Sequence, residues 1–421
     1  MTNTENSVVG MTTTKRKYRN PTIGLIATGA ILAGGVGVAN ADDTESPVTG
    51  GSETLAAATQ PGWAGVTREQ VQIDFGKGWV TKAELTYPSS AKGRLPLVIF
   101  LHGSGRNDMN QTLPEGKGTT FVPLAQAAGR EGFATLRFNK RGVTGIGPVE
   151  STDPAQLMPK NPYHQIQQDA ASVVRFAARS SKVDPSKIFL LGHSEGTNVA
   201  ANLAADPKSF GIPKPAGVVE MGVVGLPVEQ LLTFQIHGRL LAELHDEFDV
   251  NGDGQLTAVE ATDGLVGQPK EVADQFGAVL LDGKKVLAGT DRNHDGQIAI
   301  DTEAGAVLRK VTHIGDYPNL PGLDQGTIDY LKDIARFPTV SQSLPRFSGP
   351  TLLLNGENDL QTPARAAIVA DAAVSGHKDH KIVVYPGMAH TMNITPKFHP
   401  EFGEPDKQVI TEIQGWLKSH R

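Results

Sequence analysis

The stretch Ile188–Gly196 constrains the fold of this chain more than any other. It reads Ile-Phe-Leu-Leu-Gly-His-Ser-Glu-Gly and leads into an apolar helical stripe. This pattern predicts a buried strand, a sharp turn with Ser194 at its tip, and a helix. Backbone passes close to backbone in such a turn, so Gly192 and Gly196 are expected where a Cβ would clash. The serine would be strained and exposed beside a helix N-terminus, although a helix-capping serine in an ordinary turn is the alternative.

The first 62 residues are expected to precede the folded core. Basic residues between Lys15 and Arg19 are followed by an uncharged apolar run that ends in Ala39-Asn40-Ala41. This arrangement is typical of a secretory signal peptide over residues 1–41. A membrane anchor is the alternative, but the run is short and rich in glycine. Residues 42–62 are rich in small and polar residues, which indicates a flexible linker.

The composition of the 421-residue chain excludes several classes of protein. There is no cysteine, so disulfides, thiol nucleophiles and thiolate metal sites are impossible. Charged residues make up 20% of the chain with both signs mixed and a net charge of −6, so we expect no nucleic-acid surface. With the predicted signal peptide, this acidity indicates a secreted, extracellular protein with no stable membrane anchor after cleavage.

Strand and helix patterns alternate through most of the chain. Residues 71–75 and 80–87 predict an antiparallel hairpin. The alternation predicts an α/β fold with a mostly parallel sheet and helices on both faces, and it stops over residues 225–349, which predicts a helical lid between core segments 63–224 and 350–421. Besides the strand that begins at Ile188, we expect strands at Pro96–Leu101, Phe133–Phe138, Gly217–Met221, Pro350–Leu354 and Lys381–Tyr385, and helices at Phe121–Arg130, Gln165–Ser180, Ala364–Val374 and Asp406–Ser419.

A serine nucleophile needs a base, usually histidine, that a carboxylate orients. Both partners are expected on loops after late strands, because the carboxyl ends of parallel strands converge at one sheet edge. The loop after residues 350–354 carries Asp359, with Glu357 as a competitor, and the loop after residues 381–385 carries His390. Three other histidines are competitors, but none directly follows a strand: His377, His380 and His399.

Over about residues 71–419, apart from the insertion, the chain resembles the α/β-hydrolase-fold serine hydrolases. The resemblance implies that Ser194 is the nucleophile, Asp359 the orienting acid and His390 the general base, since the family spacing Gly-x-x-Asp favours this acid over its competitor. It also implies an oxyanion hole from the N–H of Glu195 and an N–H near Ser104. The matching segments are His102-Gly103-Ser104-Gly105, Gly192-His193-Ser194-Glu195-Gly196, Gly356…Asp359…Pro363 and Gly387…His390.

Two further residues take supporting roles in this resemblance. His102 is expected to brace the oxyanion loop, and Arg141 to pin the loop after its strand. The family often has Arg-Gly-x-Gly-x-Ser at this point. Here the chain reads Arg141-Gly142-Val143-Thr144-Gly145, a departure that leaves the contacts of this loop open.

The insertion carries a stretch that fits the EF-hand calcium loop at every key position. It begins at Asp249, bends at Gly254 and ends at Glu260, which is placed to bind bidentately, while Thr257 acts directly or through water. An acidic glycine-rich turn is the alternative, but it does not explain the final glutamate. The expected calcium ligands are Asp249, Asn251, Asp253, the Gln255 carbonyl and Glu260.

A second loop of the same kind begins at Asp291. Its twelfth position is Thr302, so Asp301 or Glu303 would close the site after a local shift, and we expect Glu303 to do so; a degenerate loop kept for pairing is the alternative. Because paired EF-hands join through a short β-ladder, Ile298 is expected opposite Leu256. The expected ligands are Asp291, Asn293, Asp295, Gln297 and Glu303, and the Ca²⁺ is expected to stabilise the lid without taking part in the chemistry.

These patterns together predict a secreted serine hydrolase that cleaves a small-molecule carboxylic ester through an acyl-enzyme intermediate. A serine peptidase or amidase with the same three residues is the close alternative. A calcium-dependent binding protein on an inactive hydrolase frame is the alternative from another class, and haloperoxidase or acyltransferase chemistry is less favoured.

Overall fold

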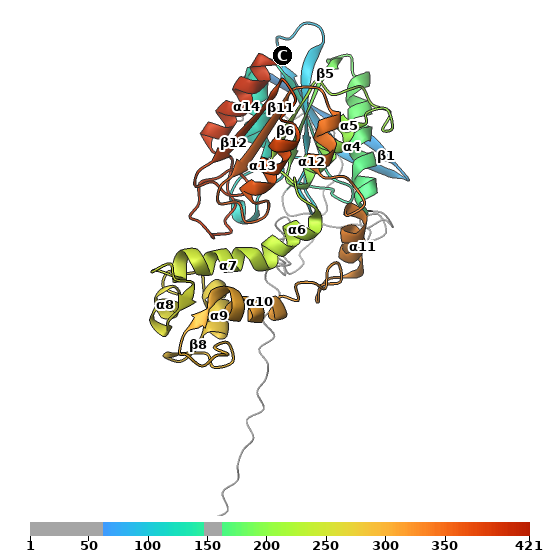
Figure 1. Ribbon diagram of the computed structural model, residues 1–421. Coiled ribbons are helices and arrows are strands. Elements are labelled where there is room, and N and C mark those ends of the chain that lie inside the picture. Colours follow the sequence, from blue (N-terminus) through green and yellow to red (C-terminus); the bar gives the residue numbers. More distant parts are fainter. Residues whose placement is uncertain (1–61, 147–161) are drawn as a thin grey trace, which may run out of the picture.

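The computed structural model describes residues 62–146 and 162–421. The predicted signal peptide and all but the last residue of the predicted linker lie outside the described residues. Within the described part, an eight-stranded sheet forms the centre of the molecule, in the order β1-β2-β4-β3-β5-β6-β11-β12 (Figure 1). The strands are β1 (Val66–Gly76), β2 (Trp79–Pro88), β3 (Leu95–Leu101), β4 (Ala134–Phe138), β5 (Val183–His193), β6 (Gly217–Met221), β11 (Thr351–Gly356) and β12 (His380–Tyr385).

Most of this sheet is parallel. Parallel pairing joins β4, β3, β5, β6, β11 and β12 in that spatial order. The strands β1 and β2 form an antiparallel hairpin, and β2 pairs antiparallel with β4. Every residue of β3 is buried, as expected for a central strand that is covered on both faces. The predicted parallel sheet and lead-in hairpin are therefore confirmed.

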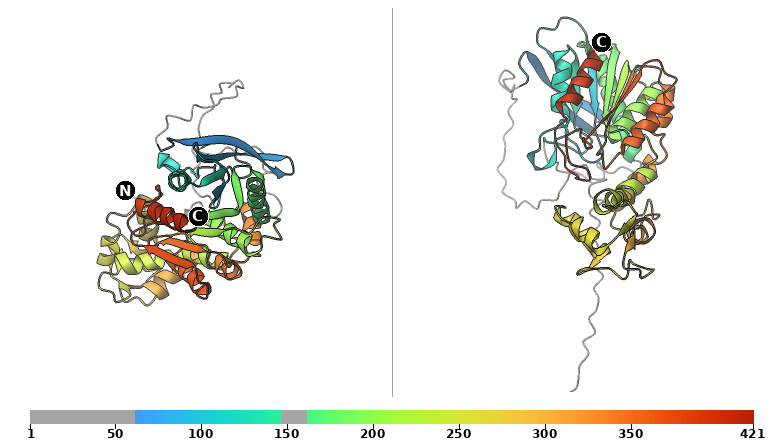
Figure 2. Two further views of the ribbon diagram at one scale, coloured as in Figure 1. Left: turned by 90° about the horizontal axis from the view of Figure 1, so that it is seen from above. Right: turned by 60° about the vertical axis from the view of Figure 1, so that its left-hand side comes forward.

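Helices cover both faces of the sheet (Figure 2). One apolar cluster joins one face to α4 (Pro162–Arg179), α5 (Glu195–Ala205) and α13 (Ala364–Ala373). A second cluster joins the other face to α2 (Phe121–Arg130) and α14 (Lys407–Ser419). No helix within residues 62–146 and 162–421 combines the length and apolar character of a membrane span. Short helical turns complete the core: η1 (Pro114–Gly116), α12 (Val340–Ser343) and η5 (Leu344–Arg346).

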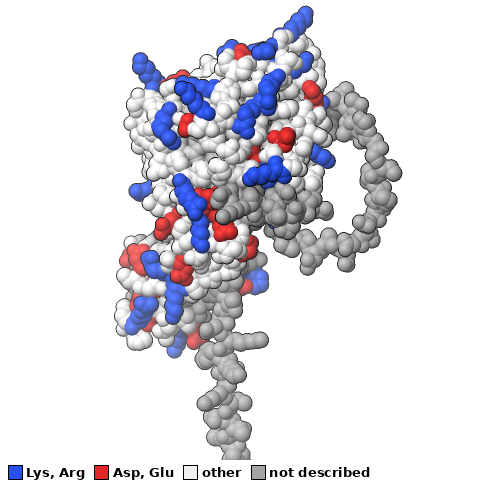
Figure 3. Space-filling model, turned by 90° about the vertical axis from the view of Figure 1, so that its right-hand side faces the viewer, with Lys and Arg blue, Asp and Glu red and all other residues white. Residues whose placement is uncertain are grey.

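The chain between β6 and α12 forms a helical layer at one end of the sheet (Figure 1). It has an apolar cluster of its own, which includes Leu244, Phe248, Phe276 and Leu308. On the face in Figure 3, basic and acidic side chains are interspersed over both the core and this layer. Its elements are α6 (Val228–Thr233), η2 (Phe234–Gly238), α7 (Arg239–Glu243), η3 (Leu244–Phe248), β7 (Gln255–Leu256), α8 (Ala258–Asp263), α9 (Lys270–Leu280), β8 (Leu281–Asp282), β9 (Lys285–Val286), β10 (Ile298–Ala299), η4 (Ile300–Ala304), α10 (Gly305–Val311) and α11 (Gln325–Ile334).

The turn between β5 and α5 has the strained geometry that the sequence predicts. Ser194 has φ 55° and ψ −122°, outside the regions that side-chain-bearing residues favour. A Cβ on Gly196 would lie 2.1 Å from the Leu101 carbonyl oxygen, and one on Gly192 would lie 2.3 Å from the Gly196 carbonyl oxygen. Both contacts are with backbone, so neither neighbour can rotate away. The predicted clash at both glycines is confirmed.

We predict that Gly196→Ala destabilises the protein by about 3 kcal/mol, because the new methyl group would force β3 and the turn apart. Gly129→Ala in α2 is the matched control, since no atom lies within 4 Å of its added Cβ. Alanine is expected to raise stability there by up to about 1 kcal/mol. Urea unfolding of both variants measures the difference, and equal stabilities would contradict the close approach.

Candidate active site

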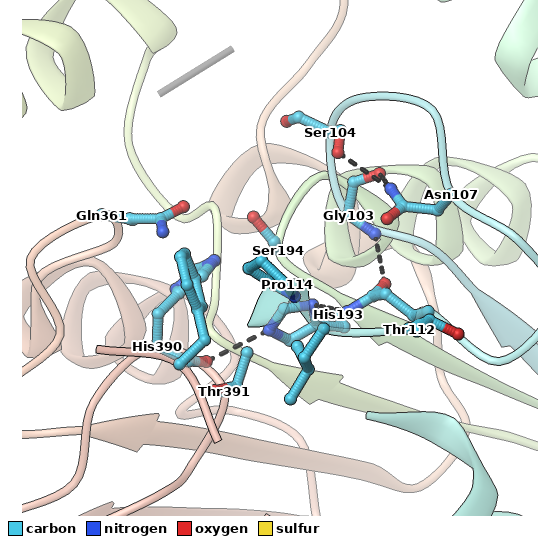
Figure 4. Close-up of a pocket in the computed structure, with 13 residues that line it drawn as sticks. Gly103, Ser104, Asn107, Thr112, Pro114, His193, Ser194, Gln361, His390 and Thr391 are labelled. Carbon is cyan, nitrogen blue, oxygen red and sulfur yellow. Dashed lines mark hydrogen bonds between the residues drawn. The ribbon is translucent and has the colours of Figure 1, made fainter. Parts of the chain in front are cut away.

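The structure brings Ser194, Asp359 and His390 together at one edge of the sheet. They follow β5, β11 and β12, whose carboxyl ends lie side by side because these strands are parallel. His390 Nδ1 and Asp359 Oδ2 are hydrogen-bonded at 2.8 Å, and both side chains are buried. Figure 4 shows Ser194 and His390 in the wall of one pocket. The arrangement therefore offers a serine hydroxyl, an imidazole and a carboxylate that holds the imidazole, which are the groups that nucleophilic catalysis requires.

The second nitrogen of the histidine ring is free. His390 Nε2 is buried and makes no hydrogen bond within the described part of the chain, and Ser194 is 8% exposed. No hydrogen bond joins the serine hydroxyl to this nitrogen in the described structure. Such contacts are often long without substrate and tighten when it binds. A nitrogen with an open lone pair beside a serine is what a general base requires.

Asp359 is held by four donors besides the histidine, of which Asn355 Nδ2 is the most distant, at 3.5 Å from Oδ2. Its Oδ1 accepts hydrogen bonds from the N–H groups of Gln361 and Thr362, both at 2.8 Å, and its Oδ2 accepts one from Thr362 Oγ1 at 2.7 Å. Burial alone would raise the pKa of Asp359, but His390 and the Thr362 hydrogen bonds outweigh burial and lower it. The carboxylate therefore stays ionised and fixes the Nδ1–H tautomer of His390.

The competing residues are placed elsewhere. Glu357 is exposed, and its N–H donates to the Tyr385 carbonyl. His380 begins β12 and lies 3.6 Å from Asp371, beyond hydrogen-bond distance. His377 bonds to His380 through its carbonyl, and His399 lines a second cavity beside His390. Of the histidines in the described ranges that compete for the base, none has a carboxylate hydrogen bond like that of His390.

Two backbone N–H groups beside Ser194 are open for an oxyanion. The N–H groups of Ser104 and Glu195 donate no hydrogen bond to any described residue, whereas Gly103 N donates to Gln111 Oε1 at 2.9 Å. A Cβ on Gly103 would lie 3.2 Å from Ser194 Cβ, which shows how closely this loop approaches the nucleophile. The geometry leaves available the two donors that the sequence predicts, and excludes the N–H of Gly103.

Two residues that sequence reasoning did not single out support the site. Gln111 Nε2 donates to His193 Nδ1 at 2.7 Å. His193 Nε2 in turn donates to the His390 carbonyl at 3.1 Å (Figure 4). Burial, reinforced by His390, lowers the pKa of His193 to about 3, so its ring stays neutral. Through Gln111 it ties the oxyanion loop to the histidine loop. His193 stands within the serine motif, but Gln111 lies in an irregular loop that carries no sequence signal.

The two predicted supporting residues have distinct surroundings. The His102 ring lies between Phe121 and Phe138, with ring centroids 5.3 and 4.8 Å away. Burial and then Lys140 lower the pKa of His102 to about 3. Arg141 donates to both carboxylate oxygens of Asp169, at 2.9 and 2.7 Å, and to the Phe75 carbonyl at 3.0 Å. Arg141 thus joins its loop to α4 and β1.

The two acidic loops of the insertion share three internal hydrogen bonds, although Asp249 Oδ1 also accepts from the N–H groups of Gly252 and Asp253. In the first, Asp249 Oδ2 accepts from Gly254 N at 2.8 Å and Asn251 Oδ1 from Asp253 N at 2.8 Å. The second loop repeats both bonds, from Gly296 N to Asp291 and from Asp295 N to Asn293. Asp253 and Asp295 likewise accept from the N–H of Gln255 and of Gln297. An antiparallel ladder pairs Ile298 with Leu256, as predicted.

The residues that end the two loops differ. Glu303 is buried and turned over the second loop, where it accepts from the N–H groups of Arg292, Asn293 and Ala299 at 2.8, 3.2 and 2.9 Å. The π-helical turn η4 accommodates the extra residue in this loop. Asp301 is exposed and contacts His245.

In the first loop Thr257 caps α8 by accepting from the N–H of Glu260, while the Glu260 carboxylate accepts from the N–H of Thr257. Across the described ranges, no group of three or more His, Asp or Glu side chains is gathered to hold a metal. Calcium binding by either loop therefore stays a prediction.

Known proteins similar to this chain include esterases. The profile of the "Alpha/beta hydrolase family" matches residues 98–398. Esterase EstD from Thermotoga maritima is 25% identical over 342 residues, which are 79% of this chain but 64% of that esterase, less than two thirds of its length. Among solved structures, Est1E from Butyrivibrio proteoclasticus is 16% identical with a TM-score of 0.41, over 83% of this chain and 98% of its own. A thermophilic esterase from Thermogutta terrifontis is 18% identical with a TM-score of 0.41, over 84% and 99%.

We predict that stability falls as the pH is lowered from about 6.5 toward 3, in part through His102 and His193. Both have folded pKa values of about 3, below the ordinary 6.5. Between these two pH values each histidine is protonated in the unfolded chain but neutral in the folded protein. Each such group contributes a slope of up to about 1.4 kcal/mol per pH unit. Lowering the pH through this window therefore favours the unfolded chain.

The measurement is urea unfolding between pH 4 and pH 7, which gives the free energy of unfolding at each pH. His193→Gln should reduce the slope of the unfolding free energy against pH by the amount that corresponds to one proton, whatever its effect on absolute stability. His313→Gln is the control, because that imidazole is 47% exposed. A slope in His193→Gln equal to that of the unchanged protein would overturn the prediction.

Proposed function

This chain belongs to the alpha/beta hydrolase family, and on that premise we propose that it is a serine esterase that cleaves a small-molecule carboxylic ester. One observation carries the proposal. An ionised Asp359 holds His390 at 2.8 Å, the other ring nitrogen is free, and this ring shares a pocket with the strained Ser194. The similarity to an esterase of Thermotoga maritima supports the choice of an ester.

In the proposed reaction, Ser194 Oγ attacks the ester carbonyl carbon and His390 Nε2 takes the hydroxyl proton. The carbonyl oxygen becomes an oxyanion that the N–H groups of Glu195 and Ser104 stabilise. The C–O bond to the alcohol then breaks, and the alcohol leaves with the proton from His390. Water attacks the acyl-serine with His390 as base again, which releases the acid and restores Ser194. Asp359 keeps the imidazole in the required tautomer and stabilises its charged form.

We also propose that the protein is exported and that Ca²⁺ stabilises the insertion. Support comes from the matching hydrogen bonds of the two loops, their ladder, and Glu303 turned over the second loop. In addition, Asp291 Oδ1 is buried without a hydrogen-bond partner among the described residues, and calcium prefers such oxygen ligands. The ligands would be the oxygens of the residues predicted from the two motifs. The ion would have a structural role, and no step of the reaction involves it.

For the catalytic residues, Ser194→Ala should lower kcat on p-nitrophenyl esters by about four orders of magnitude or more. Asp359→Asn should lower it by about 10³-fold or more, because the histidine loses its orienting charge. Glu357→Gln is the matched control two residues away, and its exposed side chain predicts no change. An equal loss of kcat in Glu357→Gln would contradict the assignment of Asp359 as the acid that orients His390.

The same assay separates the competing functions. Esters of increasing acyl length are compared with aminoacyl-anilides, and a fluorophosphonate probe reports whether Ser194 is reactive. Faster turnover of anilides than of esters would favour a peptidase or amidase. Failure of the probe to label Ser194, with no turnover of either class, would favour a binding protein on an inactive frame.

For calcium, we predict that saturating Ca²⁺ raises the Tm by about 5 °C over the chelated protein, because a ligand that binds only the folded state stabilises it. Glu303→Gln should remove a large part of this shift, whereas Asp301→Asn should retain it because that side chain faces His245. Calorimetric titration with Ca²⁺ measures binding directly. A chelated protein with the same Tm, and no heat of binding, would contradict the calcium proposal.

A further inference from the structure

A buried charge network joins the insertion to the turn that carries Ser194. Lys140, in the loop after β4, donates from Nζ to Glu195 Oε1 at 2.8 Å. The two side chains are 11% and 1% exposed, so water screens this pair only weakly. The other oxygen of Glu195 accepts a hydrogen bond from the hydroxyl of Tyr330, which lies on α11 of the insertion. One residue of the insertion thus contacts the residue next to the nucleophile.

The same lysine also holds the opposite side of the candidate oxyanion hole. Lys140 Nζ donates to the Gly103 carbonyl at 3.0 Å, and Asn107 Nδ2 donates to that carbonyl at 2.9 Å. The carbonyl of Gly103 and the N–H of Ser104 belong to one trans peptide, so they point in opposite directions. Fixing the carbonyl on Lys140 and Asn107 therefore fixes the direction of the Ser104 N–H.

Tyr330 is set up to donate its proton in this network. Its ring packs against Tyr163 of α4 in an edge-to-face contact with centroids 6.2 Å apart. Burial and the Glu195 carboxylate raise the pKa of Tyr330 well above its ordinary value, while a hydrogen bond with the Ser104 side chain opposes this rise. The hydroxyl stays neutral and donates to Glu195 on the side of the site where Ser104 lies, and these are the two residues whose N–H groups are open beside Ser194.

We propose that Tyr330 is a positioning residue: with α11 docked, its hydroxyl and Lys140 hold the Glu195 and Gly103–Ser104 backbone so that both N–H groups meet the oxyanion. This inference rests on the proposed serine esterase function. The insertion is then part of the catalytic apparatus, because the oxyanion donors reach their working geometry only when α11 is in place. Tyr330 touches neither the substrate nor Ser194 in this role, and acts through Glu195 and Ser104.

The predicted kinetic effect follows from where the network acts. A hydrogen bond to a charged group is stronger than a neutral one, and its loss leaves a buried carboxylate oxygen unsatisfied. Glu195 could then shift, and its own N–H and the Lys140 contact to Gly103 would shift with it. Donors that are displaced from the oxyanion weaken binding of the transition state more than binding of the substrate. The loss therefore falls on kcat, with KM nearly unchanged.

The test compares Tyr330→Phe with Tyr317→Phe. Tyr317 is a matched control, because its hydroxyl also contacts α11 but donates to the Leu331 carbonyl of that helix, at 2.8 Å, and not to the core. Tyr330→Phe should lower kcat on a p-nitrophenyl ester about tenfold with KM within about twofold. The same substitution should lower the affinity for a boronic acid, which forms a tetrahedral adduct with Ser194, by a similar factor. Tyr317→Phe should lower stability and leave kcat within about twofold.

Two outcomes would overturn the inference: a Tyr330→Phe variant that loses stability but keeps kcat and boronic acid affinity, or a Tyr317→Phe variant with an equal loss of kcat. Comparison of the unchanged protein with Ser194→Ala tests the proposed function separately. If neither hydrolyses any ester, amide hydrogen exchange of segment 103–107 decides the inference without turnover. Faster exchange in Tyr330→Phe but not in Tyr317→Phe supports it, and equal exchange in both refutes it.

Discussion

The backbone crossing at the serine turn is the constraint on which the rest of the structure depends. Gly196 passes the Leu101 carbonyl at a distance that excludes any Cβ, so α5 can begin only directly above β3. The same turn holds Ser194 at φ 55°. The strain has to be offset by the surrounding core, and the two apolar clusters on the sheet faces supply that support. The strained backbone of Ser194 is thus a consequence of how tightly two parallel strands and one helix pack.

Around this turn, short-range hydrogen bonds join loops that are far apart in the chain. Gln111 and His193 connect the oxyanion loop to the loop that carries His390, and Lys140 connects it to Glu195. Each link involves a buried polar group, so breaking one leaves a partner unsatisfied in a low-dielectric setting. The insertion has its own apolar cluster and adds to this system through Tyr330. Three hydrogen bonds recur in its two acidic loops, from Gly254 N, Asp253 N and Gln255 N in the first and from the corresponding N–H groups in the second.

The parts of the site that could be predicted share one property: each follows directly from a strand. Asp359 and His390 stand in loops at the ends of β11 and β12, so the order of strands and motifs is enough to bring them to one edge. Helix boundaries differ by a few residues from the predicted ones: α4 begins at Pro162, three residues before the predicted start, because proline suits the first helical turn. Of the two acids that flank Thr302, the sequence favours Glu303, and the added residue in η4 is what allows its side chain to turn over the loop.

By itself, the sequence determined the alternation of strands and helices, the serine turn with its two obligatory glycines, and the residue types after each late strand. These are local properties, because apolar periodicity, the absence of a Cβ and turn chemistry act over a few neighbouring residues. Only the tertiary structure decided which polar side chains meet: Lys140 with Glu195, Tyr330 with Glu195, and Gln111 with His193. Those partners are separated by long stretches of chain, and their contact depends on how helices dock on the sheet, which no local pattern encodes.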